Sequence, residues 1–179
     1  MVLLEMAKSF LRNVRADATV ADFTMGNGND TAFLCTQVPR GRVFAFDVQP
    51  EALENTERLL RERGLTNAVL ICDGHENLKR HLPGPIAGGM FNLGYRPGSD
   101  HTVHTQPETT VRAVTDALEL LEEGGVLVIC VYPGDEIGAR EGEALHTALS
   151  ALGRKRFSVL CCRMLNAADA PYIIAVEKY

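Results

Sequence analysis

The segment Asp22–Thr31 combines two glycines and several polar side chains in a spacing that could bind a nucleotide-like cofactor. Gly26 and Gly28 are separated by one asparagine, so the backbone can turn sharply there and approach a ligand closely. A predicted helix follows, and its first N–H groups can face the ligand. Asp47 ends the next apolar run, 19 residues after Gly28. A carboxylate at that distance can accept hydrogen bonds from ribose hydroxyls, so the pattern predicts an adenosine-containing cofactor.

Two neighbouring positions favour one cofactor over another. A dinucleotide site usually has a third small residue three positions after the second glycine, and this chain has Thr31 there. Methyltransferases tend instead to carry an acid four residues before the first glycine, which is the place of Asp22. That carboxylate could orient the turn or, through a water molecule, meet the ammonium group of S-adenosylmethionine. We therefore expect S-adenosylmethionine and keep a nicotinamide dinucleotide as the weaker alternative.

Further polar residues follow the second and third predicted strands, where an adenosine would be enclosed. Asp47 would accept both ribose hydroxyls, and Gln49 could line the adenosine pocket. The segment 73–75, Asp-Gly-His, ends the third strand at the place where an adenine is usually bound. Each of these features is weak alone, but their order and spacing together indicate a methyl donor.

Short apolar runs alternate with amphipathic stretches along the chain, which predicts an α/β fold with a mostly parallel sheet. Run 126–131 is continuously apolar, as expected of a strand that is covered on both faces. The predicted strands are Thr19–Phe23, Arg42–Asp47, Ala68–Cys72, Ile86–Asn92, Val126–Tyr132, Phe157–Met164 and Tyr172–Glu177. The helices for which bounds are predicted are Val2–Val14, Glu51–Arg63, Glu108–Glu123 and Glu141–Leu152.

The last two strands are joined by a segment too short for a crossover helix, so they should form an antiparallel pair. A mostly parallel seven-stranded sheet with a C-terminal antiparallel hairpin is the architecture of Rossmann-like class I S-adenosylmethionine-dependent methyltransferases. We expect one such domain over residues 1–179. Its ligands should bind at the carboxyl ends of the strands, beside the switch in strand order.

The fourth predicted strand ends in Asn92-Leu-Gly-Tyr95, which resembles the Asn/Asp-Pro-Pro-Tyr/Phe tetrapeptide of amino-group methyltransferases. The Asn92 carbonyl would accept a hydrogen bond from the substrate amine, and the Tyr95 ring would stack on the group that carries it. A neutral amide orients an N–H without favouring the protonated amine. Asp100 or His101, in the polar loop that follows, could accept the proton, and the segment 132–135 could face the substrate.

Composition excludes several other classes of protein. A net charge of −5 is unlike that of a protein that coats a nucleic-acid duplex, although a small RNA loop could still be contacted locally. No apolar run is long enough to span a membrane, and no signal peptide is recognised, so we expect a cytoplasmic protein. The five cysteines include no C-x-x-C pair, and we expect buried reduced thiols and no metal site.

Five segments, taken in order, resemble one small family. The chain is similar to the "putative rRNA methylase" family, whose characterised members are tRNA 5-(aminomethyl)-2-thiouridine methyltransferases acting on wobble uridine 34. The matching segments are 22–31, 46–49, 75–77, 91–98 and 105–110. The resemblance implies that the chain methylates the aminomethyl group of this uridine in the tRNA anticodon loop, as a homodimer.

The resemblance also assigns residues and leaves alternatives. It implies cofactor contacts from Asn27, Asn29, Asp47, Gln49, Gly74 and His75, and places Asn92 and Tyr95 beside the transferred methyl. The chain departs from the family pattern at Gly74, at 134–138 and in the terminal hairpin loop 166–171. The last two departures lie on the expected substrate rim. Methylation of rRNA or of a small amine, and a non-catalytic S-adenosylmethionine-binding module, are the alternatives.

Overall fold

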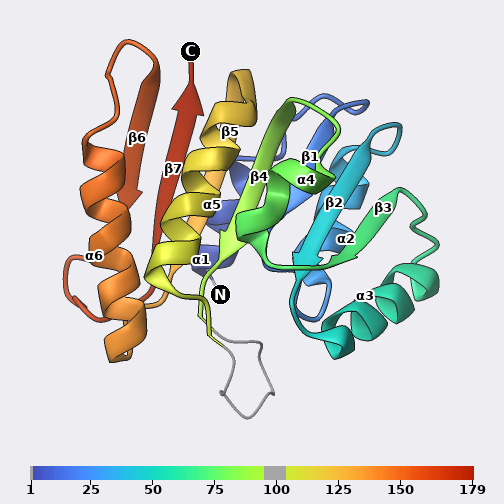
Figure 1. Cartoon of the computed structure of the whole chain (residues 1–179), viewed down its shortest axis with the longest axis horizontal. Helices are drawn as coiled ribbons and strands as arrows, with labels where there is room; N and C mark the ends of the chain where they lie inside the picture. The colour runs from blue at the N-terminus through green and yellow to red at the C-terminus, as the bar shows by residue number, and fades with distance from the viewer. Residues whose placement is uncertain (1, 95–103) are drawn as a thin grey trace.

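The strands form a single sheet in the order β3-β2-β1-β4-β5-β7-β6 (Figure 1). The computed structural model describes residues 2–94 and 104–179. All neighbouring strands are parallel except that β7 runs antiparallel to both β5 and β6. The strands are β1 (Thr19–Asp22), β2 (Arg42–Asp47), β3 (Ala68–Cys72), β4 (Ile86–Asn92), β5 (Leu121–Val131), β6 (Phe157–Cys162) and β7 (Tyr172–Lys178). The predicted mostly parallel sheet with a terminal antiparallel hairpin is confirmed.

Helices cover both faces of this sheet. In Figure 1, α4, α5 and α6 lie in front of the sheet, and α1 and α2 lie behind it. The helices are α1 (Val2–Ser9), α2 (Asn29–Gln37), α3 (Pro50–Glu62), α4 (Leu78–His81), α5 (Pro107–Leu120) and α6 (Glu136–Ser150), with a 3₁₀ turn at His75–Asn77. None of the helices in the described ranges has the length and apolar character needed to cross a membrane.

The side chains of β5 explain why its sequence is continuously apolar. Leu127 and Ile129 belong to the core cluster that packs under α5 and α6, whereas Val128 and Cys130 belong to the cluster under α1 and α2. All four are fully buried. Because successive residues of a strand point to opposite faces, a strand between two helical layers needs apolar residues at every position.

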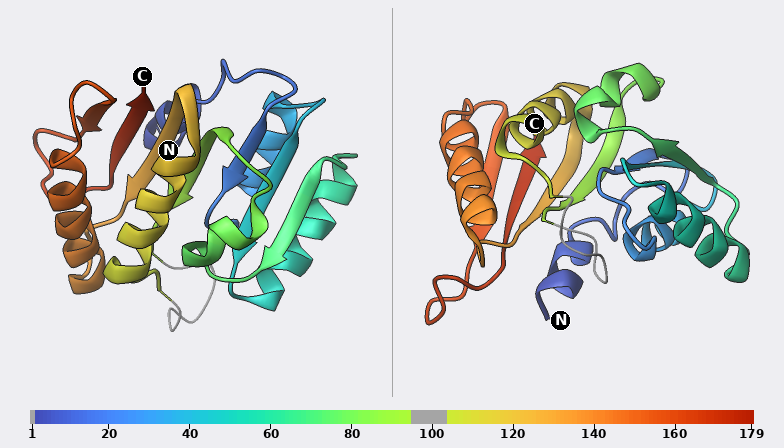
Figure 2. Two further views of the ribbon diagram at one scale, coloured as in Figure 1. Left: turned by 45° about the horizontal axis from the view of Figure 1, so that its top comes forward. Right: turned by 60° about the horizontal axis from the view of Figure 1, so that its bottom comes forward.

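The sheet order places the switch point between β1 and β4. β1 pairs with β2 on one side and with β4 on the other, so the chain leaves β1 toward one edge of the sheet and later returns beside it. The parallel strands end at the lower edge of the sheet in Figure 1, and Figure 2 (right) brings this edge forward. Ligands of doubly wound sheets bind in the crevice at this edge.

Several predicted element ends were wrong, for reasons that lie outside the local sequence. The helix predicted to end at Glu123 ends at Leu120, because Leu121 already pairs with Ile86 of β4. α6 begins five residues before the predicted Glu141, because the Asp135 side chain accepts the Gly138 N–H at 2.8 Å as an N-cap. α1 ends at Ser9 instead of Val14, β5 begins at Leu121 instead of Val126, and α4 was not predicted. Small shifts affect the ends of β1, β6 and β7.

The expectation that all cysteines are buried was also wrong. Cys35 and Cys130 are buried in the core, whereas Cys72 and Cys161 are exposed and Cys162 is half-buried. Cys72 belongs to β3 and the other two to β6, the strands at the two edges of the sheet. Helices cover an edge strand less completely than a central one, so its apolar sequence does not guarantee burial.

Lys178 stabilises the end of α5, and its replacement should destabilise the protein. Its Nζ donates to the carbonyls of Leu118, Glu119 and Leu121 at 3.2, 3.1 and 2.5 Å. We expect Lys178→Met to keep the packing of the stem, leave these carbonyls unpaired, and lower the free energy of unfolding by about 1–3 kcal/mol. Urea denaturation would measure this loss. The exposed Lys155→Met is the control and should change stability by less than about 0.5 kcal/mol.

Candidate active site

The glycine turn after β1 has a backbone conformation that only glycine adopts easily. Gly26 and Gly28 have φ angles of 51° and 83°, and Gly28 is the N-cap residue of α2. A Cβ atom at Gly28 would lie 2.8 Å from Thr56 Oγ1 and 2.9 Å from Thr56 Cα. Conformation and close packing against α3 therefore both require glycine at this position.

Asp22 is a buried carboxylate that organises this turn. It is 1% exposed, and it accepts hydrogen bonds from the Thr24 N–H at 3.1 Å and the Thr31 hydroxyl at 2.6 Å. Burial, followed by the nearby charge of Asp30, raises the pKa of Asp22 to about 7. These contacts are those of a residue that orients the turn, the first of the two roles predicted for it.

Asp47 lies at the end of β2 and contacts the same turn. Its two carboxylate oxygens accept the Gly26 N–H at 3.0 Å and the Gln49 N–H at 2.9 Å. The structure thus brings together the glycine turn and the distant acid that the sequence placed at one site. Each carboxylate oxygen has further lone pairs with which Asp47 could accept ribose hydroxyls.

α3 adds a third asparagine, Asn55, beside the turn. The Asn55 amide donates to Asn27 Oδ1 at 3.2 Å, and Asn27 and Asn29 both line a cavity of about 220 Å³. The predicted cofactor residues of the turn are therefore grouped, although Asn55 was not among them. Its position inside a regular helical pattern carries no signal that could have identified it.

His75 is a buried neutral acceptor at the end of the third βα segment. Its Nδ1 lies 3.2 Å from the carbonyl oxygen of Phe23, which can only accept, so Nδ1 carries the proton. Its Nε2 has no hydrogen-bond partner among the described residues. Burial lowers the pKa of His75, and its ring packs edge-on against Phe91 at 5.6 Å. An unprotonated ring nitrogen without a protein partner can accept a hydrogen bond from a donor that reaches it.

Asp73 is instead occupied by its own turn. It accepts hydrogen bonds from the Gly74 N–H, Asn77 Nδ2 and His81 Nε2 at 2.8, 2.9 and 2.8 Å. The bonds from His81 and Asn77 hold the pKa of Asp73 below its ordinary value. A Cβ atom added at Gly74 would lie 2.3 Å from the Glu76 carboxylate. Because this carboxylate is the far end of a flexible side chain, it could move aside.

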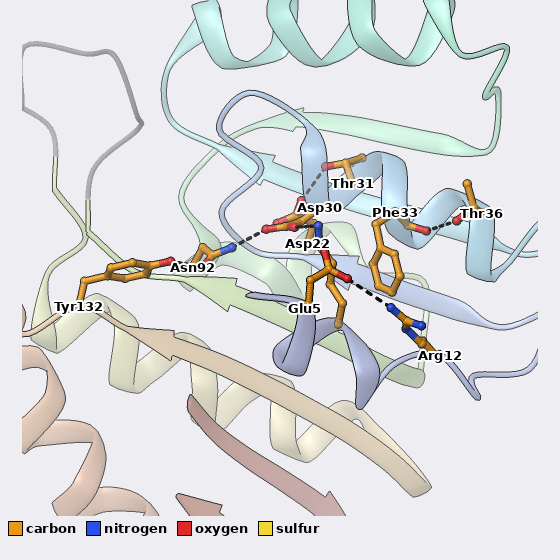
Figure 3. A network of polar contacts seen from close by, with 10 residues as sticks. Glu5, Arg12, Asp22, Asp30, Thr31, Phe33, Thr36, Asn92 and Tyr132 are labelled. Carbon is orange, nitrogen blue, oxygen red and sulfur yellow. Dashed lines mark hydrogen bonds and ion pairs between the residues drawn. The ribbon is translucent and has the colours of Figure 1, made fainter. Parts of the chain in front are cut away.

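Asn92 lies at the carboxyl end of β4, with its backbone N–H and both ends of its carboxamide bonded. Its backbone N–H donates to Thr24 Oγ1 at 2.7 Å, which joins it to the turn after β1. Its side-chain Nδ2 donates to the Asp30 carboxylate, and its Oδ1 accepts from the Tyr132 hydroxyl at 3.2 Å (Figure 3). Burial raises the pKa of Tyr132 to about 12, so the hydroxyl stays protonated.

Three residues of this site were missed or only loosely placed by the sequence. Asp30 was noted as part of a motif without a role, Lys8 was not noted, and Tyr132 was placed on the substrate rim in general terms. Lys8 Nζ forms an ion pair with Asp30 at 3.1 Å. Because Lys8 belongs to an N-terminal helix, 84 positions before Asn92, no local pattern could connect the two.

A buried carboxylate that the sequence also did not single out is linked through hydrogen bonds to Thr105, Thr110 and Gly94. Glu141, 1% exposed on α6, accepts the hydroxyls of Thr105 and Thr110 at 2.8 and 2.5 Å. Thr105 Oγ1 in turn accepts the Gly94 N–H at 2.8 Å.

The predicted Tyr95, Asp100 and His101 lie outside the described residues. Within residues 2–94 and 104–179, no group of three metal-ligating side chains is present.

Comparison with known proteins shows the family of the chain. A model of the family described as "Putative rRNA methylase" matches residues 43–178. The chain belongs to this family. The matched part contains β2 to β7 and Asn92, and the glycine turn precedes it.

Two curated relatives are methyltransferases that are longer than this chain. A chloroplastic tRNA (mnm(5)s(2)U34)-methyltransferase of Arabidopsis thaliana is 32% identical and aligns with 89% of this chain and 63% of its own length. A release factor glutamine methyltransferase of Moorella thermoacetica is 28% identical over 77% of this chain and 52% of its own. The chain therefore spans between one half and two thirds of each of these relatives.

Two similar crystal structures match nearly the whole chain. A "putative rRNA-methylase" from Clostridium thermocellum has a TM-score of 0.95 at 38% identity, and a "putative methyltransferase" from Streptococcus mutans in complex with SAH has a TM-score of 0.91 at 38% identity. Both comparisons cover 98% of this chain and 97% of the other. The predicted class I methyltransferase fold is thereby confirmed.

Gly28→Ala should disturb both folding and ligand binding, because the added Cβ meets Thr56 and the residue must keep a positive φ. Gly64 is a matched control, since its φ is +67° and its Cβ would meet nothing within 4 Å. We expect Gly64→Ala to cost about 1–2 kcal/mol for the backbone alone and Gly28→Ala clearly more. Calorimetric titration with SAH should show weakened binding for Gly28→Ala alone. Equal effects of the two variants on stability and affinity would contradict the close packing at Thr56.

Asp22 should make the stability of the protein depend on pH in a defined direction. Its folded pKa is raised, so the stabilisation is complete below about pH 4 and is lost as the pH rises through about 7. In urea denaturation at successive pH values, the wild type should lose stability relative to Asp22→Asn between pH 4 and 8. Asp17→Asn, at an exposed position, controls for the loss of a carboxylate. A difference that is constant with pH would refute a raised pKa of Asp22 in the folded protein.

Proposed function

We propose that the protein is an S-adenosylmethionine-dependent N-methyltransferase that converts 5-aminomethyl-(2-thio)uridine to 5-methylaminomethyl-(2-thio)uridine at the tRNA wobble position. The observation that carries the proposal is the position of Asn92 at the end of β4, where its backbone N–H donates to Thr24 Oγ1 in the turn that follows β1 and its carboxamide bonds Asp30 and Tyr132. Family membership supports a methyltransferase, and the Arabidopsis relative, at 32% identity, supports the tRNA substrate.

The residues of the site fit the proposed cofactor. Asp47 would bind the ribose hydroxyls, Gln49, Gly74 and His75 would enclose the adenosine, and the turn that contains Asn27 would face the methionine part. His75 Nε2 is an acceptor without a partner among the described residues, which suits a ligand donor such as an adenine amino group. When bound, S-adenosylmethionine would supply a methyl group on a sulfonium sulfur. An amine lone pair can attack this methyl carbon in line with the bond to the sulfur, which leaves as a thioether.

The protein itself has mainly to align the amine and keep its lone pair free. Asn92 Oδ1 would accept one N–H of the substrate, in addition to the Tyr132 hydroxyl that it already accepts. Since the amide is neutral, it directs the lone pair without stabilising the ammonium form. The new N–C bond forms as the S–C bond breaks, and the nitrogen loses its proton to a base or to water. Alignment of this kind supplies a large part of the rate.

The proposal includes three features that rest on the sequence and the family resemblance. Tyr95 would stack on the uracil ring, the protein would act as a homodimer, and it would be cytoplasmic. Methylation of rRNA or of a small amine, or binding of S-adenosylmethionine without turnover, would be recognised as different outcomes of the test below.

Mass analysis of tRNA nucleosides tests the proposal. A strain that lacks the gene should accumulate the unmethylated 5-aminomethyl nucleoside, and purified protein with S-adenosylmethionine should methylate that tRNA. Asn92→Ala should lower the rate by at least about 100-fold because alignment is lost, while its affinity for SAH changes little. Asn13→Ala, at an exposed position after α1, should behave as the wild type. An unchanged tRNA profile, or full turnover by Asn92→Ala, would refute the proposal.

A further inference from the structure

Four polar side chains from four parts of the fold form one continuous chain of contacts through Asn92. Lys8 of α1 pairs with Asp30 of α2, Asp30 accepts the amide of Asn92 on β4, and Asn92 accepts the hydroxyl of Tyr132 after β5. Figure 3 shows Asp30, Asn92 and Tyr132 in line at the carboxyl ends of the strands. Only Asn92 is assigned a part in the proposed reaction.

The orientation of the Asn92 carboxamide matters because its two ends have opposite hydrogen-bonding properties. A half turn about the last side-chain bond would present N–H groups, instead of the carbonyl oxygen, to the substrate amine. An ionised Asp30 can only accept, so it selects Nδ2. The Tyr132 hydroxyl stays protonated and donates to Oδ1. Both neighbours therefore select the same orientation, the one that a substrate N–H requires.

Lys8 holds Asp30 in place from the opposite side. Its Nζ lies 3.1 Å from Asp30 Oδ1, and the two side chains are only 17% and 15% exposed. The ammonium group also lies 5.5 Å from the centre of the Phe33 ring, on the same helix as Asp30. Ala7 and Leu11 are fully buried beside it, which anchors this part of the chain on the sheet. A charge pair that is largely desolvated keeps its geometry better than a surface pair.

The pair also balances the negative charge around the turn. Asp30 and Asp47 both raise the pKa of the buried Asp22, so three carboxylates act on one another in this region. Among the lysines and arginines that the structure describes, Lys8 is the one that forms an ion pair with any of these three carboxylates. Without this cation, Asp30 would lose the partner on its other side, and its contact with the Asn92 carboxamide would be held less firmly.

We propose that Asp30 and Lys8 are positioning residues that act through Asn92: they fix its carboxamide so that Oδ1 faces the substrate amine. This inference rests on the proposed methyl transfer to an amine. It makes the N-terminal helix part of the active site, since α1 contributes the cation that holds the acceptor.

A reciprocal exchange of Asp30 and Asn92 tests the inference. Asn92→Asp alone places two carboxylates in contact and should lower both the unfolding midpoint and the rate of methyl transfer. Asp30→Asn alone leaves an amide that can bond in either orientation, and should lower kcat roughly tenfold with little change in the affinity for SAH. In the double variant an amide again donates to a carboxylate, with the partners exchanged. We expect it to recover at least about tenfold in kcat over Asn92→Asp, together with most of the unfolding midpoint.

Lys8 is tested against a lysine in a different environment. Lys8→Met should lower kcat several-fold without weakening SAH binding, and Lys8→Arg should restore most of the rate because it can still pair with Asp30. Lys79, in a surface ion pair with Asp116 at 2.6 Å, gives the control Lys79→Met, which should leave kcat unchanged. Equal effects at the two lysines would contradict a role for Lys8 in the site.

The outcomes separate this inference from the proposed function. If the wild type does not methylate tRNA that carries the 5-aminomethyl nucleoside, the proposed function fails, whereas the unfolding midpoints of the four forms still report whether Asp30 and Asn92 are coupled. If the wild type is active but the double variant is no faster and no more stable than Asn92→Asp, the inference is overturned. Recovery of both quantities supports it.

Discussion

The buried carboxylate of Asp22 connects the glycine turn to the residue proposed to act on the substrate, and much of the site depends on it. One oxygen accepts the backbone N–H of Thr24, whose own hydroxyl accepts the backbone N–H of Asn92. The other accepts the hydroxyl of Thr31, the neighbour of Asp30, which bonds the Asn92 side chain. A buried carboxylate needs a hydrogen-bond partner for each of its oxygens. Asp22 is therefore linked to Asn92 in two ways, through Thr24 to the backbone and through α2 to the side chain.

The electrostatic character of this region suits the proposed cofactor. Asp22, Asp30 and Asp47 lie around the turn. Burial raises the pKa of Asp22, and the charges of Asp30 and Asp47 raise it further. Lys8 neutralises only part of this charge. A cofactor that carries a sulfonium and an ammonium group would complement such a region, whereas a pyrophosphate would be repelled by it. The acidic environment therefore supports S-adenosylmethionine over a dinucleotide for a reason separate from the spacing of the glycines.

Much of the fold could be predicted because its signals are local. The sequences of β2, β3 and β4 are apolar runs bounded by turns or charges, and their predicted bounds agree with the structure. The end of α5 could not be predicted in this way, since it is decided by pairing of Leu121 with Ile86 and by the amine of Lys178, 57 residues from Leu121. Burial of Cys72 and Cys161 was wrongly predicted because only the strand order shows that their strands lie at the edges.

The sequence by itself determined the glycine turn, the acid at Asp47 and the asparagine at the end of the fourth strand, because each depends on residue type and short spacing. The tertiary structure alone decided how Asn92 is held. Its side-chain partners Asp30 and Tyr132 come from other parts of the chain, and Asp30 is paired in turn with Lys8. They meet Asn92 only because β4 lies between β1 and β5. Hydrogen bonds and ion pairs act over a few ångströms, so residues far apart in the chain become partners only when the sheet brings them within that distance.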